Sequence, residues 1–324
     1  MGYGAVILVA GLTDFVARPF STALQGSFPP FVIFTFAILG MILATRPLYL
    51  VFNRRPDPIR QLVTDVKDNA AWFVSIAILC WALPTSLDAA TTLKKAIPLN
   101  QPFYADPLLI EIDRMVFGGK DAWQLTHAIF GTWATRFIDA AYTFWVVAQI
   151  LLGIGIILAR DLRFKIQVAL TFQLSWALLG AGLATFSSSV GPCFLFEFYS
   201  DRTFLPLMEE LRSVGNLGAL AGMEYLLASQ GTNSIGSGIS AMPSLHVGIS
   251  VIIALCIREK APRLQWLGWG YLAIMYIGSI HLGWHYASDG VVSGVLVAAL
   301  WYGVRFLVNW AAKAPAKPVA SASS

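Results

Sequence analysis

The chain has 324 residues, of which 57% are hydrophobic and only 12% are charged. Soluble globular proteins are roughly 45–50% apolar and about 25% charged, so this composition excludes a soluble protein and predicts an integral membrane protein. The net charge of +4 is small, and most basic residues flank apolar runs, which indicates membrane orientation rather than nucleic-acid binding.

Several apolar runs approach or exceed the roughly 20 residues that a helix needs to cross the hydrocarbon core. We therefore predict an all-α integral membrane protein with a six-helix transmembrane core, interfacial helices and an N-terminal segment that is either a short extra span or interfacial. Seven apolar runs are candidates for the core and the N-terminal part of the membrane domain; in chain order they are 28–52, 70–90, 137–159, 166–190, 243–257, 264–283 and 287–310.

Two longer stretches between the spans do not cross the membrane. Residues 91–135 include a short amphipathic helix at 106–114, which we expect in the interface, and residues 191–241 end in a Gly/Ser-rich loop. The chain thus divides into an N-terminal membrane or interfacial segment (1–27), N-terminal transmembrane helices (28–90), a transmembrane catalytic domain (91–310) and a disordered tail (311–324). The three cysteines have no metal or redox spacing.

Basic residues predict the orientation. The loops after the spans 28–52, 137–159 and 243–257, together with the C-terminal flank, contain 14 of the 22 Lys and Arg residues. Positive loops stay in the cytoplasm, so alternation places 91–135 and 191–241 on the other face. We expect a multi-pass protein, in the bacterial inner membrane with its site facing the periplasm, or with the equivalent lumenal orientation elsewhere.

Two short motifs concentrate the polar side chains that chemistry needs. They read Ser-Ala-Met-Pro-Ser-Leu-His at 240–246 and His-Leu-Gly-Trp-His-Tyr-Ala-Ser-Asp at 281–289. His281, His285 and Asp289 follow at intervals of four, which on a helix lines one face with three titratable groups. The orientation puts both motifs on the same side of the membrane, as a shared site requires.

The motifs suggest phosphoryl chemistry. Pro243 opens a helix whose free N–H groups, with the Ser240 and Ser244 hydroxyls, form an anion site. His285 is the predicted nucleophile, and Asp289, one turn later, fixes its tautomer. His246 is the predicted general acid, which protonates the leaving alkoxide.

These residues resemble the signatures of the type 2 phosphatidic acid phosphatase superfamily. Pro-Ser-Leu-His at 243–246 is similar to its Pro-Ser-Gly-His motif, and residues 285–289 are similar to its His-x-x-x-Asp motif. The Leu in the first motif, Lys-Ala-Ile-Pro at 95–98 and Ser-Val-Gly-Pro-Cys at 189–193 look like the branch that contains fungal inositol phosphorylceramide synthases and related bacterial proteins.

The resemblance implies a lipid phosphatase or phosphotransferase that works through a phosphohistidine on His285, without metal or cofactor. The superfamily's usual phosphate clamp is absent, because no Lys motif precedes Gly191-Pro192 and Ser279 stands where an Arg is expected. We carry Ser240, Ser244, His281 and Arg202 forward as candidate phosphate-binding residues. The cationic side chains that could replace the clamp are Lys94, Lys95, Arg114, Arg202 and Arg212.

The expected partners are the bilayer, a membrane lipid substrate (a lipid phosphate or phosphodiester) and an alcohol or lipid acceptor if the reaction is a head-group transfer. No nucleic acid is expected. Two interpretations from other classes stay open: a proton-coupled transporter that uses His281, His285 and Asp289 as a relay, and a zinc site on the same residues. His127 is interpreted as structural.

Overall fold

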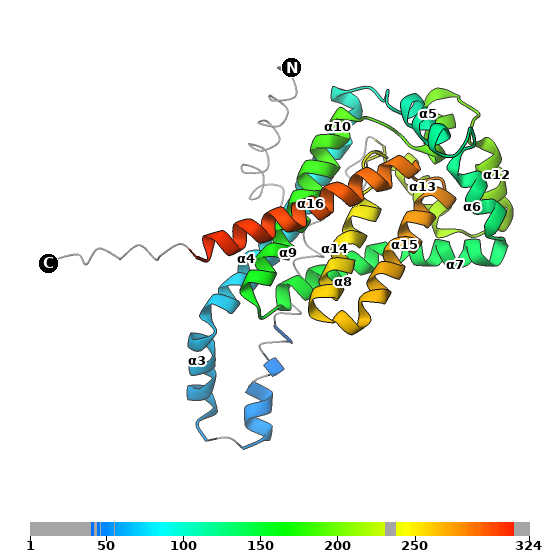
Figure 1. Ribbon diagram of the computed structural model, residues 1–324. Helices are drawn as coiled ribbons and strands as arrows, with labels where there is room; N and C mark the ends of the chain where they lie inside the picture. The colour runs from blue at the N-terminus through cyan, green and yellow to red at the C-terminus, as the bar shows by residue number, and fades with distance from the viewer. Residues whose placement is uncertain (1–39, 42–43, 46, 55, 231–237, 314–324) are drawn as a thin grey trace.

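We describe the protein from a computed structural model, which covers residues 40–41, 44–45, 47–54, 56–230 and 238–313. All regular secondary structure in these residues is helical (Figure 1). The N-terminal segment 1–27, most of the predicted span 28–52 and most of the tail 311–324 lie outside the described residues.

The helices follow one another closely along the chain. In the first half they are α3 (Pro58–Asp68), α4 (Ala70–Asn100), α5 (Asp106–Val116), α6 (Ala122–Ile129), α7 (Thr132–Thr143), α8 (Trp145–Leu158), α9 (Leu162–Leu174), the π-helical η1 (Ser175–Leu183) and α10 (Ala184–Phe186). In the second half they are η2 (Pro192–Phe194), α11 (Leu195–Tyr199), α12 (Leu205–Val214), α13 (Gly218–Ala228), α14 (Leu245–Lys260), η3 (Pro262–Leu264), α15 (Gln265–His281) and α16 (Ala287–Ala311).

Four helical segments of the described chain are long and apolar enough to cross a membrane. They are Ala70–Asn100, Thr132–Leu158, Leu162–Phe186 and Ala287–Ala311. The helices α14, with 16 residues, and α15, with 17, are shorter than these four. The all-helical membrane architecture is therefore confirmed, whereas the count of six spans stays a prediction.

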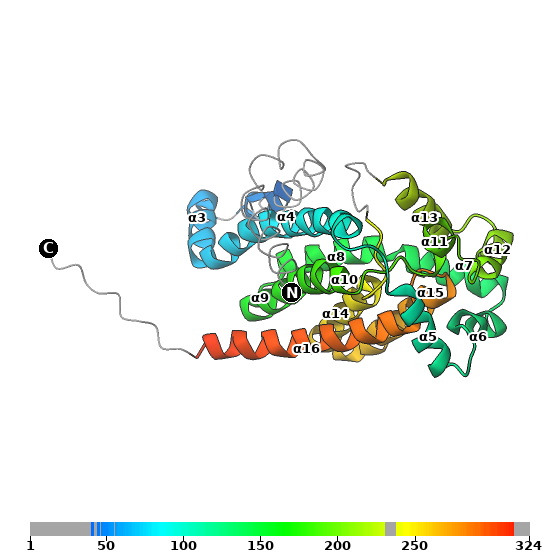
Figure 2. The same ribbon diagram turned by 90° about the horizontal axis from the view of Figure 1, so that it is seen from above.

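Helix α14 lies at the centre of the bundle. It packs against α15, α16, α9 and η1, and in Figure 2 it lies between α8 and α16. Ile249, Ile252 and Ala254 on α14 are completely buried. A Cβ added to Gly248 would lie only 2.6 Å from the Ser293 Oγ of α16, so glycine is what lets these two helices approach closely. This packing fixes the start of α14, which carries the first motif.

Helix α4 is longer than the sequence predicts. The expected span ends at residue 90, but the helix continues to Asn100 and contains Pro84 and Pro98. Thr, Lys and Ala at 91–96 permit helix, and a helix can leave the hydrocarbon core without ending. As a result, Lys94 lies on the last turns of α4 instead of in a loop.

The second motif does not form one helix, and the prediction of three groups on one helical face is wrong. Helix α15 ends at His281 and α16 begins at Ala287. Gly283 between them has φ +73°, a left-handed conformation that glycine adopts without steric cost and that ends helices. His281 and His285 therefore belong to different local structures.

Basic loops and the two motifs lie at opposite ends of α14 and α16. At the basic end, Lys260 Nζ contacts Asp161 Oδ2 at 2.8 Å and Arg305 Nη1 contacts Glu259 Oε2 at 3.2 Å. These contacts join the loops after α8 and α14 to the C-terminal part of α16. This separation agrees with the sidedness that the charge pattern predicts.

Candidate active site

The two motifs meet through their histidines. His246 lies in the first turn of α14, and His285 lies in the short connection between α15 and α16. The His246 Nδ1 and His285 Nε2 atoms are 3.1 Å apart. Residues 39 positions apart in the chain thus form one site.

The His285 ring is held by its other nitrogen. Its Nδ1 lies 2.9 Å from the Ala241 carbonyl oxygen and 3.3 Å from Asp289 Oδ2. Both of these partners accept, so Nδ1 carries the proton and Nε2 keeps a free electron pair. The ring is therefore in the tautomer that a nucleophile at Nε2 requires.

Asp289 connects the two motifs. It is completely buried at the start of α16, and its Oδ2 also accepts the Tyr286 N–H at 3.0 Å. Its backbone carbonyl accepts the Ser244 N–H at 3.3 Å. Among the described residues, the second carboxylate oxygen, Oδ1, has no hydrogen-bond partner, so this buried carboxylate keeps an unused acceptor beside the histidines.

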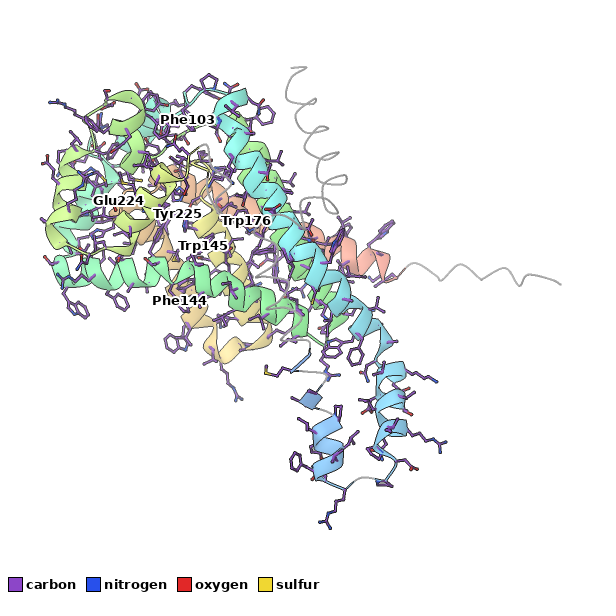
Figure 3. The ribbon with its side chains drawn as sticks, turned by 180° about the vertical axis from the view of Figure 1, so that it is seen from behind. Phe103, Phe144, Trp145, Trp176, Glu224 and Tyr225 are labelled. Atoms are coloured by element: carbon purple, nitrogen blue, oxygen red, sulfur yellow. The ribbon has the colours of Figure 1, made fainter. Side chains whose placement is uncertain are left out.

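Aromatic rings surround His246. Tyr142 stacks on it with centroids 4.7 Å apart, Trp145 lies at 4.3 Å and Trp284 at 5.6 Å. Figure 3 shows Trp145 and Trp176 in the middle of the bundle, and their centroids are 6.4 Å apart. His246 stays partly exposed, whereas the exposed fraction of His285 is 4%. Of the two rings, His246 is therefore the more accessible one.

The segment after α10 braces the first motif. Ser189 accepts hydrogen bonds from Ala241 N with its carbonyl oxygen and from Met242 N with its hydroxyl, both at 3.0 Å. Gly191 has φ +91°, and a Cβ there would lie 2.7 Å from the Trp284 carbonyl oxygen. Only glycine allows the chain to pass so close to the His285 loop.

Two carboxylates of α5 hold the His285 segment from the other side. Asp113 accepts the N–H groups of Ala287 at 2.6 Å and Ser288 at 3.0 Å, and so caps α16. Asp106, also buried, accepts the Tyr286 hydroxyl at 2.9 Å. Burial, together with the Asp106 carboxylate, raises the pKa of Tyr286 well above its ordinary value, which keeps this donor protonated.

From the sequence alone, Asp106 and Asp113 are expected to cap and charge their own helix rather than to take part in catalysis. Asp106 and Asp113 are seven residues apart, which places them on one helical face. This spacing shows that the two side chains share a face, but it does not identify what that face contacts. The partners, Tyr286 and Ala287, are 180 and 174 positions away in the chain.

The candidate phosphate-binding residues lie at different places. Ser244 is buried, and its hydroxyl accepts the Val247 N–H at 3.4 Å as the N-cap of α14. Ser240 is partly buried, directly before Ala241. Arg202 is exposed in the connection between α11 and α12. Ser240 precedes Ala241, whose carbonyl contacts His285, and Ser244 contacts Asp289 through its backbone N–H.

His281 is directed away from the other histidines of the motifs. It is completely buried, and its Nδ1 and Nε2 lie 3.0 Å and 2.9 Å from the hydroxyls of Thr126 and Thr135. His127 stacks on it at 4.0 Å, lies 2.9 Å from its carbonyl oxygen through Nε2 and contacts Glu210 through Nδ1. This arrangement favours a structural role for both residues.

A metal centre finds no support in the described ranges. Within them, no three His, Cys, Asp or Glu side chains are grouped in a way that could hold a metal ion.

Comparison with known proteins gives one match. Residues 108–304, more than half of the chain, match the PAP2 superfamily. The matched range includes both histidine motifs and α5 from residue 108 onward, but not Asp106 or the end of α4. The chain has no match among the curated proteins or the solved structures.

Proposed function

Because the chain belongs to the PAP2 superfamily, whose membership indicates a phosphatase or phosphotransferase type of activity, we propose that it cleaves a lipid phosphate ester or phosphodiester through a phosphohistidine. The observation that carries this proposal is the 3.1 Å contact between His246 and His285, with Asp289 behind His285. The alternative of a proton relay through His281 loses support, because both ring nitrogens of His281 are taken by threonines.

In the first step, His285 Nε2 attacks the phosphorus atom, and the bond from phosphorus to the leaving oxygen breaks. Because His285 Nε2 is unprotonated, the proton between the two rings sits on His246 Nδ1. As the general acid, His246 is protonated on both ring nitrogens; it gives the Nδ1 proton to the leaving alkoxide, which departs as an alcohol, and becomes a neutral imidazole. Asp289 and the Ala241 carbonyl stabilise the positive charge that His285 acquires.

In the second step, water or an acceptor alcohol attacks the phosphohistidine. His246, now neutral at Nδ1, accepts the proton of the attacking hydroxyl, and His285 leaves with its electron pair. Hydrolysis and transfer thus use the same residues. Transfer to an alcohol, as in the inositol phosphorylceramide synthase branch, is the second candidate, favoured by the aromatic rings around His246 because they restrict the access of water.

A groove in the membrane part of the bundle supports a lipid substrate. It has a volume of about 700 Å³ and is lined mostly by apolar side chains of α8, α9, α14 and α15. Its lining includes Phe144, which directly precedes Trp145 on the chain (Figure 3), and Trp145 contacts His246. The lining also includes Arg160 and Lys260. An acyl chain of a lipid whose phosphate is at His285 fits such a groove.

The charge pattern supports a site that faces the periplasm, or its lumenal equivalent. The basic loops would be cytoplasmic, and the histidines lie at the other end of α14. This orientation can be tested with single cysteines introduced at exposed positions near each end. They are labelled on intact cells with a membrane-impermeant reagent.

The decisive experiment incubates the full-length protein in detergent with lipid phosphates and phosphodiesters, with and without an alcohol acceptor, and identifies the products by mass spectrometry. Cleavage that persists in chelator, together with an acid-labile phosphoryl-enzyme that His285→Ala lacks, is the expected result. Absence of turnover on every phospholipid class, with no phosphoryl-enzyme, would contradict the proposal.

A further inference from the structure

The proposed reaction needs a cation that the histidine site does not supply. The transferring phosphoryl group spreads negative charge over its equatorial oxygens, and enzymes stabilise this charge with lysine, arginine or metal. His246, His285 and Asp289 contain no permanent positive charge. Ser279 cannot help, since it is completely buried and its hydroxyl donates to the Tyr276 carbonyl.

Most of the cations that the sequence offers on this side are engaged or distant. Arg114 forms two hydrogen bonds with Asp121, at 2.7 and 3.1 Å. Arg202 and Arg212 are exposed on the surface. Lys95 interacts electrostatically with Asp88 of its own helix. None of these four has a described contact with the histidine motifs.

Lys94 differs from the others in its position. It is partly buried on the last turns of α4, and its charge acts on His246. A Cβ added to Gly238 would lie 3.2 Å from the Lys95 backbone N and 3.3 Å from Lys94 Cγ, so the segment that leads into the first motif runs against the backbone of α4 at Lys94 and Lys95 and against the base of the Lys94 side chain. Two residues later this segment reaches Ser240.

The end of α4 is fixed relative to the site. The Ser188 hydroxyl donates to the Gln101 carbonyl at 3.1 Å, and the Ser188 carbonyl accepts the N–H groups of Tyr104 and Ala105. The next residue, Ser189, binds the backbone of the first motif. Lys94 is therefore on a helix whose end is anchored, through Ser188 and Ser189, to the first motif.

The Lys94 ammonium has no protein partner in the part of the chain that the structure describes. No hydrogen bond or ion pair joins it to another described residue, although a partly buried ammonium is costly without an anion. An anionic ligand would satisfy it.

We propose that Lys94 binds the phosphoryl oxygens of the substrate, a phosphate monoester or diester head group, and supplies the positive charge that the two histidines lack. This inference rests on the proposed function, and it adds a residue outside the range that matches the superfamily. Lys94 touches the substrate only through the non-bridging oxygens, while His285 and His246 carry out the bond-making and proton transfer.

The test uses the full-length protein and measures two quantities. One is turnover of the lipid phosphate or phosphodiester that the mass-spectrometry assay identifies as a substrate. The other is inhibition by orthovanadate, which mimics the pentacoordinate phosphorus. Lys94→Met should lower kcat/KM and weaken vanadate inhibition by about 10- to 100-fold, the worth of a hydrogen bond to a charged group. Lys94→Arg should recover part of both. Lys95→Met, one residue further on the same helix, is the matched control and should behave like the wild type. Thermal unfolding in detergent identifies variants that fail to fold.

The outcomes separate the two proposals. If the wild type neither turns over substrate nor responds to vanadate, the proposed function fails. If the wild type does both and Lys94→Met keeps its vanadate sensitivity and kcat/KM, Lys94 is not the phosphate-binding cation. A variant with lower thermal stability but unchanged vanadate inhibition would likewise overturn the inference, since it would show a structural lysine.

Discussion

Two pairs of histidines lie near the same end of the bundle, and their hydrogen bonding differs. In the pair His127 and His281, all four ring nitrogens have protein partners: Thr126, Thr135, Glu210 and the His281 carbonyl. In the pair His246 and His285, the rings contact each other, and His246 Nε2 has no partner among the described residues. The ring nitrogens of the first pair are all used in hydrogen bonds that hold the fold together, whereas the second pair has a ring nitrogen that can still bind a ligand.

The carboxylates beside the two pairs differ in the same way. Glu210, at 50% side-chain exposure, ends the hydrogen-bond chain of the first pair in water. Asp289, at 0%, stands behind His285 with one oxygen unpartnered. Buried polar groups without partners cost free energy, and proteins tend to keep such costs at functional sites. Side-chain type does not distinguish the pairs, whereas hydrogen-bond satisfaction does.

The largest effect is expected for the nucleophile. His285→Ala should reduce turnover on the order of 10⁴-fold or more, because the phosphohistidine cannot form. Product release measured on the purified variant, alongside its thermal unfolding in detergent, checks this. A folded variant with near wild-type turnover would remove His285 from the reaction.

The next effect concerns the orientation of the ring. Asp289→Asn preserves shape but can donate to His285 Nδ1, which disfavours the reactive tautomer. We expect kcat to fall about 100-fold or more with little change in KM. An unchanged kcat would mean that the Ala241 carbonyl alone fixes the tautomer.

The other histidine pair should respond in stability and not in chemistry. His281→Ala leaves the hydroxyls of Thr126 and Thr135 without their buried partners, which should lower the free energy of unfolding by about 2–4 kcal/mol. Unfolding in mixed detergent micelles measures this loss, while kcat per folded molecule should stay near the wild-type value. A selective loss of kcat at wild-type stability would reverse the contrast between the pairs.

The smallest effect lies at the opposite end of the bundle. The hydrogen bond from Lys260, followed by that from the Phe164 N–H, lowers the pKa of Asp161. Its ion pair therefore stabilises the fold above the unfolded value of about 3.9 and is lost as the pH falls through the lower folded pKa. Since both groups are largely exposed, the contribution is at most about 1 kcal/mol.

Asp161→Asn keeps the helix cap but removes the charge. The variant should be slightly less stable than the wild type at pH 7 and equal to it once acid has protonated Asp161. Thermal unfolding as a function of pH measures this difference, and a difference that grows in acid would contradict the assigned pKa direction. Turnover should not change.

The sequence by itself determined the class of structure and the pair of motifs. Hydropathy over about 20 residues is a local property, so the spans at 70–90, 137–159, 166–190 and 287–310 correspond to apolar helices of the structure. The motifs at 240–246 and 281–289 also identified the superfamily, because each motif consists of contiguous residues and can be recognised without knowing the fold.

Tertiary structure alone decided how each polar side chain is used. His281 and His285 have the same spacing as a helical pair, but the left-handed turn at Gly283 sends them to different partners. Asp106 and Asp113 of α5 contact the His285 segment although they are far away in the chain. Their roles depend on distances across packed helices, which no local pattern of residues encodes.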